Sequence, residues 1–435
     1  MLIAVETIIQ AMVYVLQVVP VGTNIGLLRV MWAMSNGSFL KSRGAVHGAL
    51  AESGFSDEEI RRSWTALGYG SWAIEELVAS WGQQVASANT WRERRYGAGA
   101  HWARVKSVDI TAFWRPRLQG QVSKHYNSAA QKALPAIVFG VMSISGESGG
   151  QRLPLVSAII RCDAETTEAA FRKELLKQVA ESAVPNEATV VDAGFGLKEI
   201  QENEVKEFVL RMAKNCTARR NQLPQQKRGR PAEYGEYIRP LARTYKQKRI
   251  PATAVADEEG EFVHQERTIR YRAWHQLVTS ETKVAATNQT FSLFVFHDPL
   301  YAEPLVLATD LALRADHLFF IYLDRWPVEH PPLAAKQMIG LHRQFVSADE
   351  AKFRLPELAL LTGNILAHIA AQLPPMPTGF WDRNPQPTPG RLRRVLGRAL
   401  FPNLPEVDPR FRKKNSVTDH LPKGWFGQRQ QPGSS

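Results

Sequence analysis

Four residues between positions 322 and 336 have types and spacings that suit the handling of phosphate groups. Tyr322 is followed by Arg325, then by Glu329 and Lys336. On an unbroken helix, at roughly 100° per residue, the four side chains would lie within an arc of about 60°. A carboxylate can bind a divalent metal ion, cationic side chains place fixed charge near phosphates, and a tyrosine hydroxyl can donate to one. The spacing therefore predicts phosphoryl transfer.

Prolines interrupt this segment. Pro327, Pro331 and Pro332 flank Glu329. Each proline lacks a backbone N–H and disfavours helix in the residue before it, although proline is tolerated at a helix start. We therefore expect one helix to end near Trp326 and another to begin near Pro331 or Pro332, with Glu329 in a kink between them.

Two aspartates upstream complete a set of three acids. Asp109 ends the alternating segment RVKSVDIT, and Asp192 follows the apolar strand in ATVVDAGFG. Three carboxylates can hold two metal ions about 4 Å apart, one activating the attacking water or 3′-hydroxyl and the other neutralising the leaving oxygen. We predict that Asp109, Asp192 and Glu329 hold two Mg²⁺ ions, for which Mn²⁺ can substitute. Competing candidates for the third ligand, without the Tyr-Arg-Trp context, are Asp310, Asp316 and Asp324.

The elements around these acids predict a mixed α/β fold. Strands are expected at 104–111, 135–144 and 153–162, an amphipathic helix at 166–183, and strands ending in Asp192 and in EFVLRMAKN. This β-β-β-α-β-(α)-β order is that of a ribonuclease H-like domain. On that topology, Asp109 and Asp192 lie at the ends of neighbouring strands.

We expect five segments along the chain. They are a helical N-terminal domain (1–100), the first part of a ribonuclease H-like catalytic core (101–213), a basic β-rich insertion (214–310), the second part of the core (311–373) and a Pro-rich basic tail (374–435). Eleven of the 26 prolines fall in the last 62 residues, so the tail is expected to be extended or disordered.

Two interpretations of the N-terminal helical region are possible. Ser56 followed by Glu59 predicts a capping box that opens a helix, and further helices are expected on either side. Three short helices could form a helix-turn-helix that reads DNA ends, which the paired Arg61 and Arg62 favour. A plain helical bundle is the alternative.

Residues 1–19 are strongly apolar but contain Glu6, Gln10 and Gln17, and they lack the basic start of a signal peptide. We expect a buried helix there, and a peripheral membrane helix is the alternative. We do not expect the protein to have a membrane partner. The two cysteines, Cys162 and Cys216, exclude a disulfide framework and suit a reducing cytoplasm.

Positive charge is concentrated in two segments. The formal net charge is +12, of which residues 214–249 carry +9 and residues 374–435 carry +7. Such clustering is typical of a surface that binds a polyanion. Within KRGRP (227–231), Lys227, Arg228 and Arg230 could enter a narrow minor groove or contact phosphates without reading sequence. Trp274 could stack on an unpaired base or belong to the core.

The spacing of Tyr322, Arg325, Glu329 and Lys336 resembles the Y-(2)-R-(3)-E-(6)-K signature of DDE transposases of bacterial insertion sequences. Asp109 in VDIT and Asp192 in VDAGF resemble the first and second aspartate motifs of that family. Further segments similar to the family contain Arg211 and Asn215, Gly229-Arg230-Pro231, and Tyr234-Gly235. The resemblance extends over roughly residues 100–370.

The resemblance implies a cut-and-paste DNA transposase of the bacterial cytoplasm, associated with the nucleoid. It implies metal-dependent cleavage at terminal inverted repeats, strand transfer into target DNA, and a homodimer that synapses the two ends; a hairpin intermediate is compatible with it. Tyr322, Arg325 and Lys336 would hold the strand being cut, and Arg211 would also contact DNA. The alternatives are a non-catalytic DNA-binding protein derived from such an element and a structure-specific nuclease of the same fold.

Overall fold

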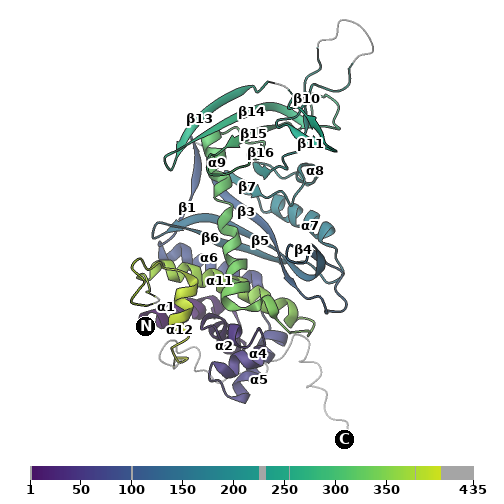
Figure 1. Ribbon diagram of the computed structural model, residues 1–435. Helices are drawn as coiled ribbons and strands as arrows, with labels where there is room; N and C mark the ends of the chain where they lie inside the picture. Colours follow the sequence, from purple (N-terminus) through teal and green to yellow (C-terminus); the bar gives the residue numbers. More distant parts are fainter. Residues whose placement is uncertain (1, 99–100, 225–231, 254, 378, 403–435) are drawn as a thin grey trace. The chain divides into compact units, whose positions relative to one another are not determined.

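The computed structural model describes residues 2–98, 101–224, 232–253, 255–377 and 379–402 (Figure 1). The chain forms two compact units, each assembled from segments distant in sequence. The first unit contains Met1–Glu93, Asp109–Phe171 and the chain from Pro327 onward, and the second contains Arg94–Val108 and Arg172–Trp326.

The first unit begins with helices, as the sequence predicts. Helix α1 (Leu2–Val15) is largely buried, and α2 (Thr23–Ser35), α3 (Ser38–Lys41), α4 (Val46–Glu52), α5 (Asp57–Tyr69) and α6 (Ile74–Ala88) follow. The predicted capping box is confirmed. The side-chain oxygen of Ser56 accepts from the backbone N–H of Glu59, and the Glu59 carboxylate accepts from the backbone N–H of Ser56 at 2.9 Å.

Helix α11 (Ala351–Gln372) organises the core of the first unit. Nearly all of its side chains are buried, because it packs against α1, α2, α5 and α6 and against the strands β5 (Lys132–Ser148) and β6 (Gln151–Arg161). A helix that is apolar on all sides is typical of such a central position. Strands β5 and β6 form a long antiparallel pair, and β5 also pairs with β1 (Arg92–Glu93) and β4 (Lys124–Asn127).

The second unit contains a large mixed sheet. Strand β3 (His101–Trp114), whose residues 101–108 belong to this unit, pairs in parallel with β7 (Glu187–Val191), which pairs in parallel with β8 (Phe208–Arg211). Beyond β8 the order continues with antiparallel strands β16 (Leu305–Thr309), β15 (Phe291–His297), β14 (Arg267–Thr279) and β9 (Ala218–Arg220). Strand β13 (Glu258–His264) pairs with β14, and β2 (Arg95–Ala98) with β3.

The predicted strands and helices from β3 to β8 are present in the predicted order, with the short strand β4 in addition between β3 and β5. Helix α7 (Glu168–Glu181) lies between β6 and β7, and α8 (Leu197–Glu202) between β7 and β8. The strand that ends before Asp192 lies beside the first predicted strand, as expected. Asp109 does not end its strand, because β3 continues to Trp114. The region expected to be β-rich is β-rich, and its strands extend the sheet from β8 outward. The chain is thus a mixed α/β protein with a large mixed sheet and N-terminal helices.

Part of the C-terminal tail is folded, which differs from the extended tail that its prolines predict. Residues Pro389–Leu396 form helix α12, capped by the Thr388 side chain, which accepts from the backbone N–H of Arg391. Leu392 and Leu396 are fully buried. Proline is tolerated at the first turn of a helix, so the composition of the tail does not prevent this helix.

No helix in the described part of the chain is both long and apolar enough to cross a bilayer.

Candidate active site

The predicted site residues belong to both units, and each group is described within its own unit. The first unit holds Asp109, Glu329 and Lys336, and the second holds Asp192, Tyr322 and Arg325.

Asp192 directly follows strand β7. Val191 is in parallel register with Leu210 of β8, so the next residues along the two strands are Asp192 and Arg211. Accordingly, Arg211 Nη1 lies 3.5 Å from Asp192 Oδ1. The same oxygen accepts a 2.7 Å hydrogen bond from the backbone N–H of Ala193, which orients the carboxylate at the start of the glycine-containing turn. The side chain of Asp192 is 32% exposed, so a ligand can reach it.

A second arginine approaches the same carboxylate. Arg325 Nη2 lies 3.6 Å from Asp192 Oδ2, and the Arg325 side chain is only 4% exposed. Its guanidinium also lies over the ring of Tyr322, 5.6 Å from the ring centroid. Burial raises the pKa of Tyr322, the charge of Asp192 raises it further, and Arg325 opposes this. Tyr322 is therefore a protonated hydroxyl, able to donate a hydrogen bond.

Helix α9 (Ala315–Leu323) presents Tyr322 to this group. It packs on β7 and β8, with Leu318 and Ile321 fully buried in the core of the second unit. The structure thus brings together Asp192, Tyr322 and Arg325, with Arg211 beside them.

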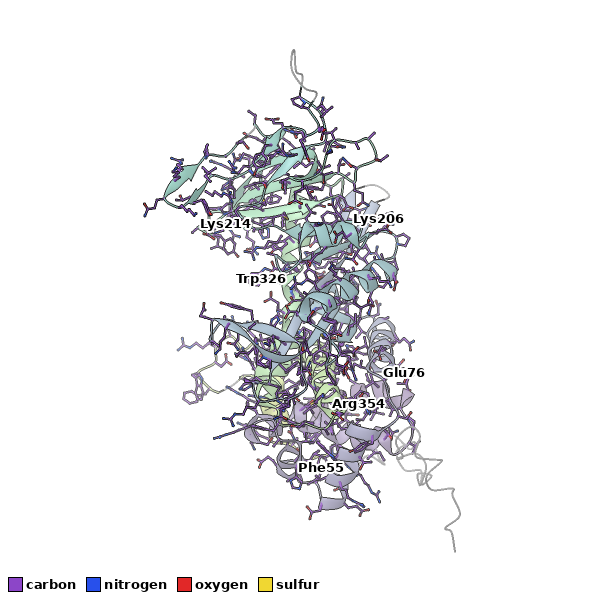
Figure 2. All side chains as sticks on the ribbon, turned by 90° about the vertical axis from the view of Figure 1, so that its right-hand side faces the viewer. Phe55, Glu76, Lys206, Lys214, Trp326 and Arg354 are labelled. Carbon is purple, nitrogen blue, oxygen red and sulfur yellow. The ribbon has the colours of Figure 1, made fainter. Side chains whose placement is uncertain are left out.

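A cavity of ≈ 350 Å³ in the second unit shares residues with this group. Arg211 and Tyr322 line it, together with Lys214 and two aromatic side chains, Tyr301 and Trp326. Lys214 and Trp326 are labelled in Figure 2. Tyr301 and Trp326 are each 56% exposed. Aromatic faces beside cationic groups suit a planar ring that carries a phosphate, such as an unstacked nucleotide. This cavity was not predictable from the sequence, because its two exposed rings belong to segments without a common motif.

Trp274, for which the sequence allows either base stacking or a place in the core, is buried in the second unit. Its side chain is 1% exposed, within strand β14 opposite Leu293 of β15. The guanidinium of Arg272 lies 5.6 Å from its ring centroid. This burial favours the interpretation as a core tryptophan, and base stacking by Trp274 stays a prediction.

In the first unit, Lys336 is held against strand β3. Its Nζ donates a 2.7 Å hydrogen bond to the hydroxyl of Thr111. The ammonium also lies over the rings of Phe113 and Trp114, at 5.5 and 5.2 Å from the centroids. Burial lowers the pKa of Lys336 to about 8, and the charge of Asp109 partly opposes this. Thr111 was not predicted as a partner of Lys336; it stands two residues after Asp109, so it lies on the same face of the strand.

The expected kink around Glu329 is confirmed, and an unbroken helical stripe from Tyr322 to Lys336 is wrong. After α9 ends at Leu323, residues Trp326–Glu329 form a 3₁₀ turn, His330–Leu333 form the short helix α10, and Ala334–Ile339 form a π-helix. Glu329 is exposed at the end of the 3₁₀ turn. Burial lowers the pKa of His330, and Glu329 opposes this. The helix type changes twice because prolines remove the regular hydrogen bonds.

The competing acids have structural partners. Asp324 is fully buried and accepts from Arg94 at 2.8 Å and from the Tyr96 hydroxyl at 2.7 Å. Asp310 accepts from the backbone N–H of Phe208 at 2.8 Å, and burial raises its pKa. Asp316 pairs with Arg314. Each of these carboxylates thus stabilises local structure.

Lys227, Arg228 and Arg230 lie outside the described residues. Among the residues that the structure does describe, no three His, Cys, Asp or Glu side chains are clustered as a metal site would require. In comparisons with protein-family models and with curated proteins, nothing matches this chain.

Proposed function

We propose that this chain is a DDE-type DNA transposase with a ribonuclease H-like catalytic core, which cleaves DNA at the ends of a mobile element and joins the freed 3′-hydroxyls to target DNA. Asp109, Asp192 and Glu329 hold two Mg²⁺ ions, and DNA is bound by the basic segments. The protein acts on paired ends as a homodimer in the nucleoid.

One observation carries the proposal. In the parallel register of β3 and β7, the last paired residues are Val108 and Val191, and each is followed directly by an aspartate. The parallel pairing therefore ends just before these two acids, although β3 itself continues to Trp114. In α/β sheets, ligands bind at the carboxyl ends of parallel strands, and Asp192 stands at that end of β7. The position of Asp109 and Asp192 beside each other in the register, together with the motifs around both residues, supports their assignment as metal ligands.

The donor chemistry suits magnesium. The three carboxylates offer hard oxygen ligands, and none of the three side chains is fully buried. Bound metal ions would lower the pKa of the attacking hydroxyl and neutralise the leaving oxygen. The protein supplies the remaining groups. Arg211 and Arg325 place fixed positive charge beside Asp192, where a phosphate of the cleaved strand would lie, and Tyr322 donates a hydrogen bond to it.

The test uses a supercoiled plasmid that carries the DNA flanking both ends of the gene. With Mg²⁺, the wild-type protein is expected to release the intervening segment and to join it to a second plasmid. Asp192→Asn keeps the size of the side chain and removes its charge, so cleavage should vanish while DNA binding is retained. Asp349→Asn is the matched control, because Asp349 is fully exposed.

The outcomes separate the candidates. Persistent cleavage by Asp192→Asn would refute the site. Nicking of branched DNA without strand transfer would show a nuclease instead, and DNA binding by the wild type without any cleavage would show a non-catalytic protein.

A further inference from the structure

A groove in the first unit lies beside Lys336. Its volume is ≈ 780 Å³. It is formed by the segment that follows strand β3 and by the segment that follows the 3₁₀ helix Leu341–Arg343. The lining residues that matter here are Trp114, Arg115, Arg117, His342, Gln344 and Phe345.

Gln344 has an unusual environment in this groove. Its side chain is 2% exposed, and neither Nε2 nor Oε1 has a hydrogen-bond partner among the residues that the structure describes. A buried amide that pairs with nothing is destabilising, and native proteins keep few of them without a reason. An amide presents one donor and one acceptor side by side, which is the pattern that recognises the edge of a nucleobase.

The rest of the lining suits a nucleotide. Of the residues that the structure describes, no carboxylate lines the groove, whereas Arg115 and Arg117 do. Arg115 is held in place by donating a 2.8 Å hydrogen bond to the carbonyl of Val346, and Arg117 is exposed. Phe345 is 65% exposed, so its ring is available for stacking. Cationic groups for a phosphate and an aromatic face for a base are the components of single-strand binding sites.

The groove adjoins Lys336 and strand β3. Trp114 belongs both to the groove lining and to the pair of rings beneath the Lys336 ammonium. His342 Nδ1 donates to the carbonyl oxygen of Lys336 at 2.9 Å. A DNA strand that reaches Lys336 could therefore continue into the groove.

We propose that this groove binds one unpaired nucleotide of a DNA strand, with the Gln344 amide pairing to the base edge, Phe345 stacking on the base and Arg117 contacting its phosphate. Adenine is the base whose adjacent donor and acceptor fit both atoms of a glutamine amide. Because the amide is buried in the free protein, binding requires the Gln344 side chain to turn toward the base, and this movement breaks no hydrogen bond to a described residue. The proposal rests on the proposed function only in taking DNA as the polymer.

The test measures fluorescence anisotropy with two labelled duplexes in metal-free buffer, where no cleavage occurs. One duplex ends in a single unpaired dA, and the other ends in an abasic nucleotide. The wild-type protein should prefer the dA end by on the order of tenfold. In Gln344→Leu this preference should fall to about twofold or less, while thermal stability is unchanged or raised, because no protein hydrogen bond is lost.

Two surface variants keep the test decisive if Gln344→Leu does not fold. Phe345→Ala should lose most of the preference for the dA end. Arg117→Ala should weaken binding of both duplexes equally and reduce the dependence of affinity on salt. Gln83→Leu, at an exposed glutamine of α6, is the matched control and should change neither the preference for the dA end nor the affinity for the duplexes.

Retention of the full dA preference by both Gln344→Leu and Phe345→Ala would overturn the proposal. This result is independent of the cleavage assay. If the protein prefers the dA end through Gln344 but never cleaves DNA, the nucleotide-binding groove is supported and the transposase function is refuted. If it cleaves DNA without this preference, the transposase function is supported and the nucleotide-binding groove is refuted.

Discussion

The ion pair between strand β6 and helix α11 offers a quantitative test of how the core of the first unit is held together. Arg161 Nε and Nη2 donate to the two carboxylate oxygens of Glu357 at 2.7 and 2.9 Å, and Arg161 Nη1 donates to Glu350 at 2.9 Å. The Glu357 side chain is 1% exposed. This carboxylate therefore depends on Arg161 for most of the charge that compensates its burial.

Replacing Arg161 with methionine keeps the apolar stem and removes the charge. An uncompensated buried carboxylate costs about 3–5 kcal/mol of unfolding free energy. For a unit of this size, each kcal/mol corresponds to a change in melting temperature of roughly 2–4 °C. Arg161→Met should therefore lower the melting temperature by roughly 6–20 °C, measured by tryptophan fluorescence or calorimetry at pH 7.

The loss should depend on pH in a defined direction. Burial raises the pKa of Glu357 above its ordinary value of 4.5, and Arg161 opposes that rise. Without Arg161 the folded-state pKa rises further, so the folded protein binds a proton that the unfolded chain has released. The stability of Arg161→Met is then preserved below about pH 4.5 and lost as the pH rises through the folded-state pKa. The difference from wild type should shrink as the pH falls toward 4.5.

A double variant identifies the cause. Arg161→Met with Glu357→Gln removes both charges, so it should recover much of the stability that Arg161→Met loses, giving a coupling energy above about 1 kcal/mol. Additive losses, or a loss below about 1 kcal/mol in Arg161→Met alone, would refute the argument that this pair compensates a buried charge.

Two further predictions concern the helix that carries Lys336. Burial lowers the pKa of Lys336 from 10.5 to about 8. The wild-type protein should therefore gain up to about 3 kcal/mol of unfolding free energy relative to Lys336→Met as the pH rises from 8 to 10.5, measured by urea unfolding. An equal dependence of unfolding free energy on pH in the two proteins would contradict the pKa shift. Gly363→Ala would place a methyl group 2.9 Å from Ala334 Cβ and 3.2 Å from the Pro331 carbonyl, so it should displace the Lys336 helix and reduce DNA cleavage more than DNA binding. Gly82→Ala, where a methyl group meets nothing within 4 Å, is its control and should leave cleavage unchanged.

Features that depend on local chemistry were predictable from the sequence. The capping box at Ser56 needs only a hydroxyl and a carboxylate three residues apart, and the break around Glu329 follows from proline geometry. The order of strands and helices from β3 to β8 follows from apolar periodicity and turn residues. These features are encoded within a few neighbouring residues.

Features that depend on distant packing were not predictable. Trp274 stands between Ala273 and His275 in its strand, a context that fits either a core or a surface ring. Only the neighbouring strands decide that it is buried. The folded helix α12 is stabilised by burial of Leu392 and Leu396, which a proline-rich composition does not reveal. The amide of Gln344, which has no hydrogen-bond partner among the described residues, is likewise recognised only once its surroundings are known.

The four residues of the Tyr-Arg-Glu-Lys spacing are not positioned by one continuous helix. Its first two members end the second unit, where they approach Asp192, and its last two belong to the first unit, where Lys336 is fixed beside Asp109 by Thr111. The chain passes from one unit to the other between Trp326 and Pro327. A regular helix would fix the four side chains by a constant rotation per residue, whereas a 3₁₀ turn, a short α-helix and a π-helix in succession fix Lys336 only through its contacts. The spacing is therefore maintained by what each residue touches, so an insertion or deletion between Glu329 and Lys336 should be tolerated less well than any single substitution of the residues between them.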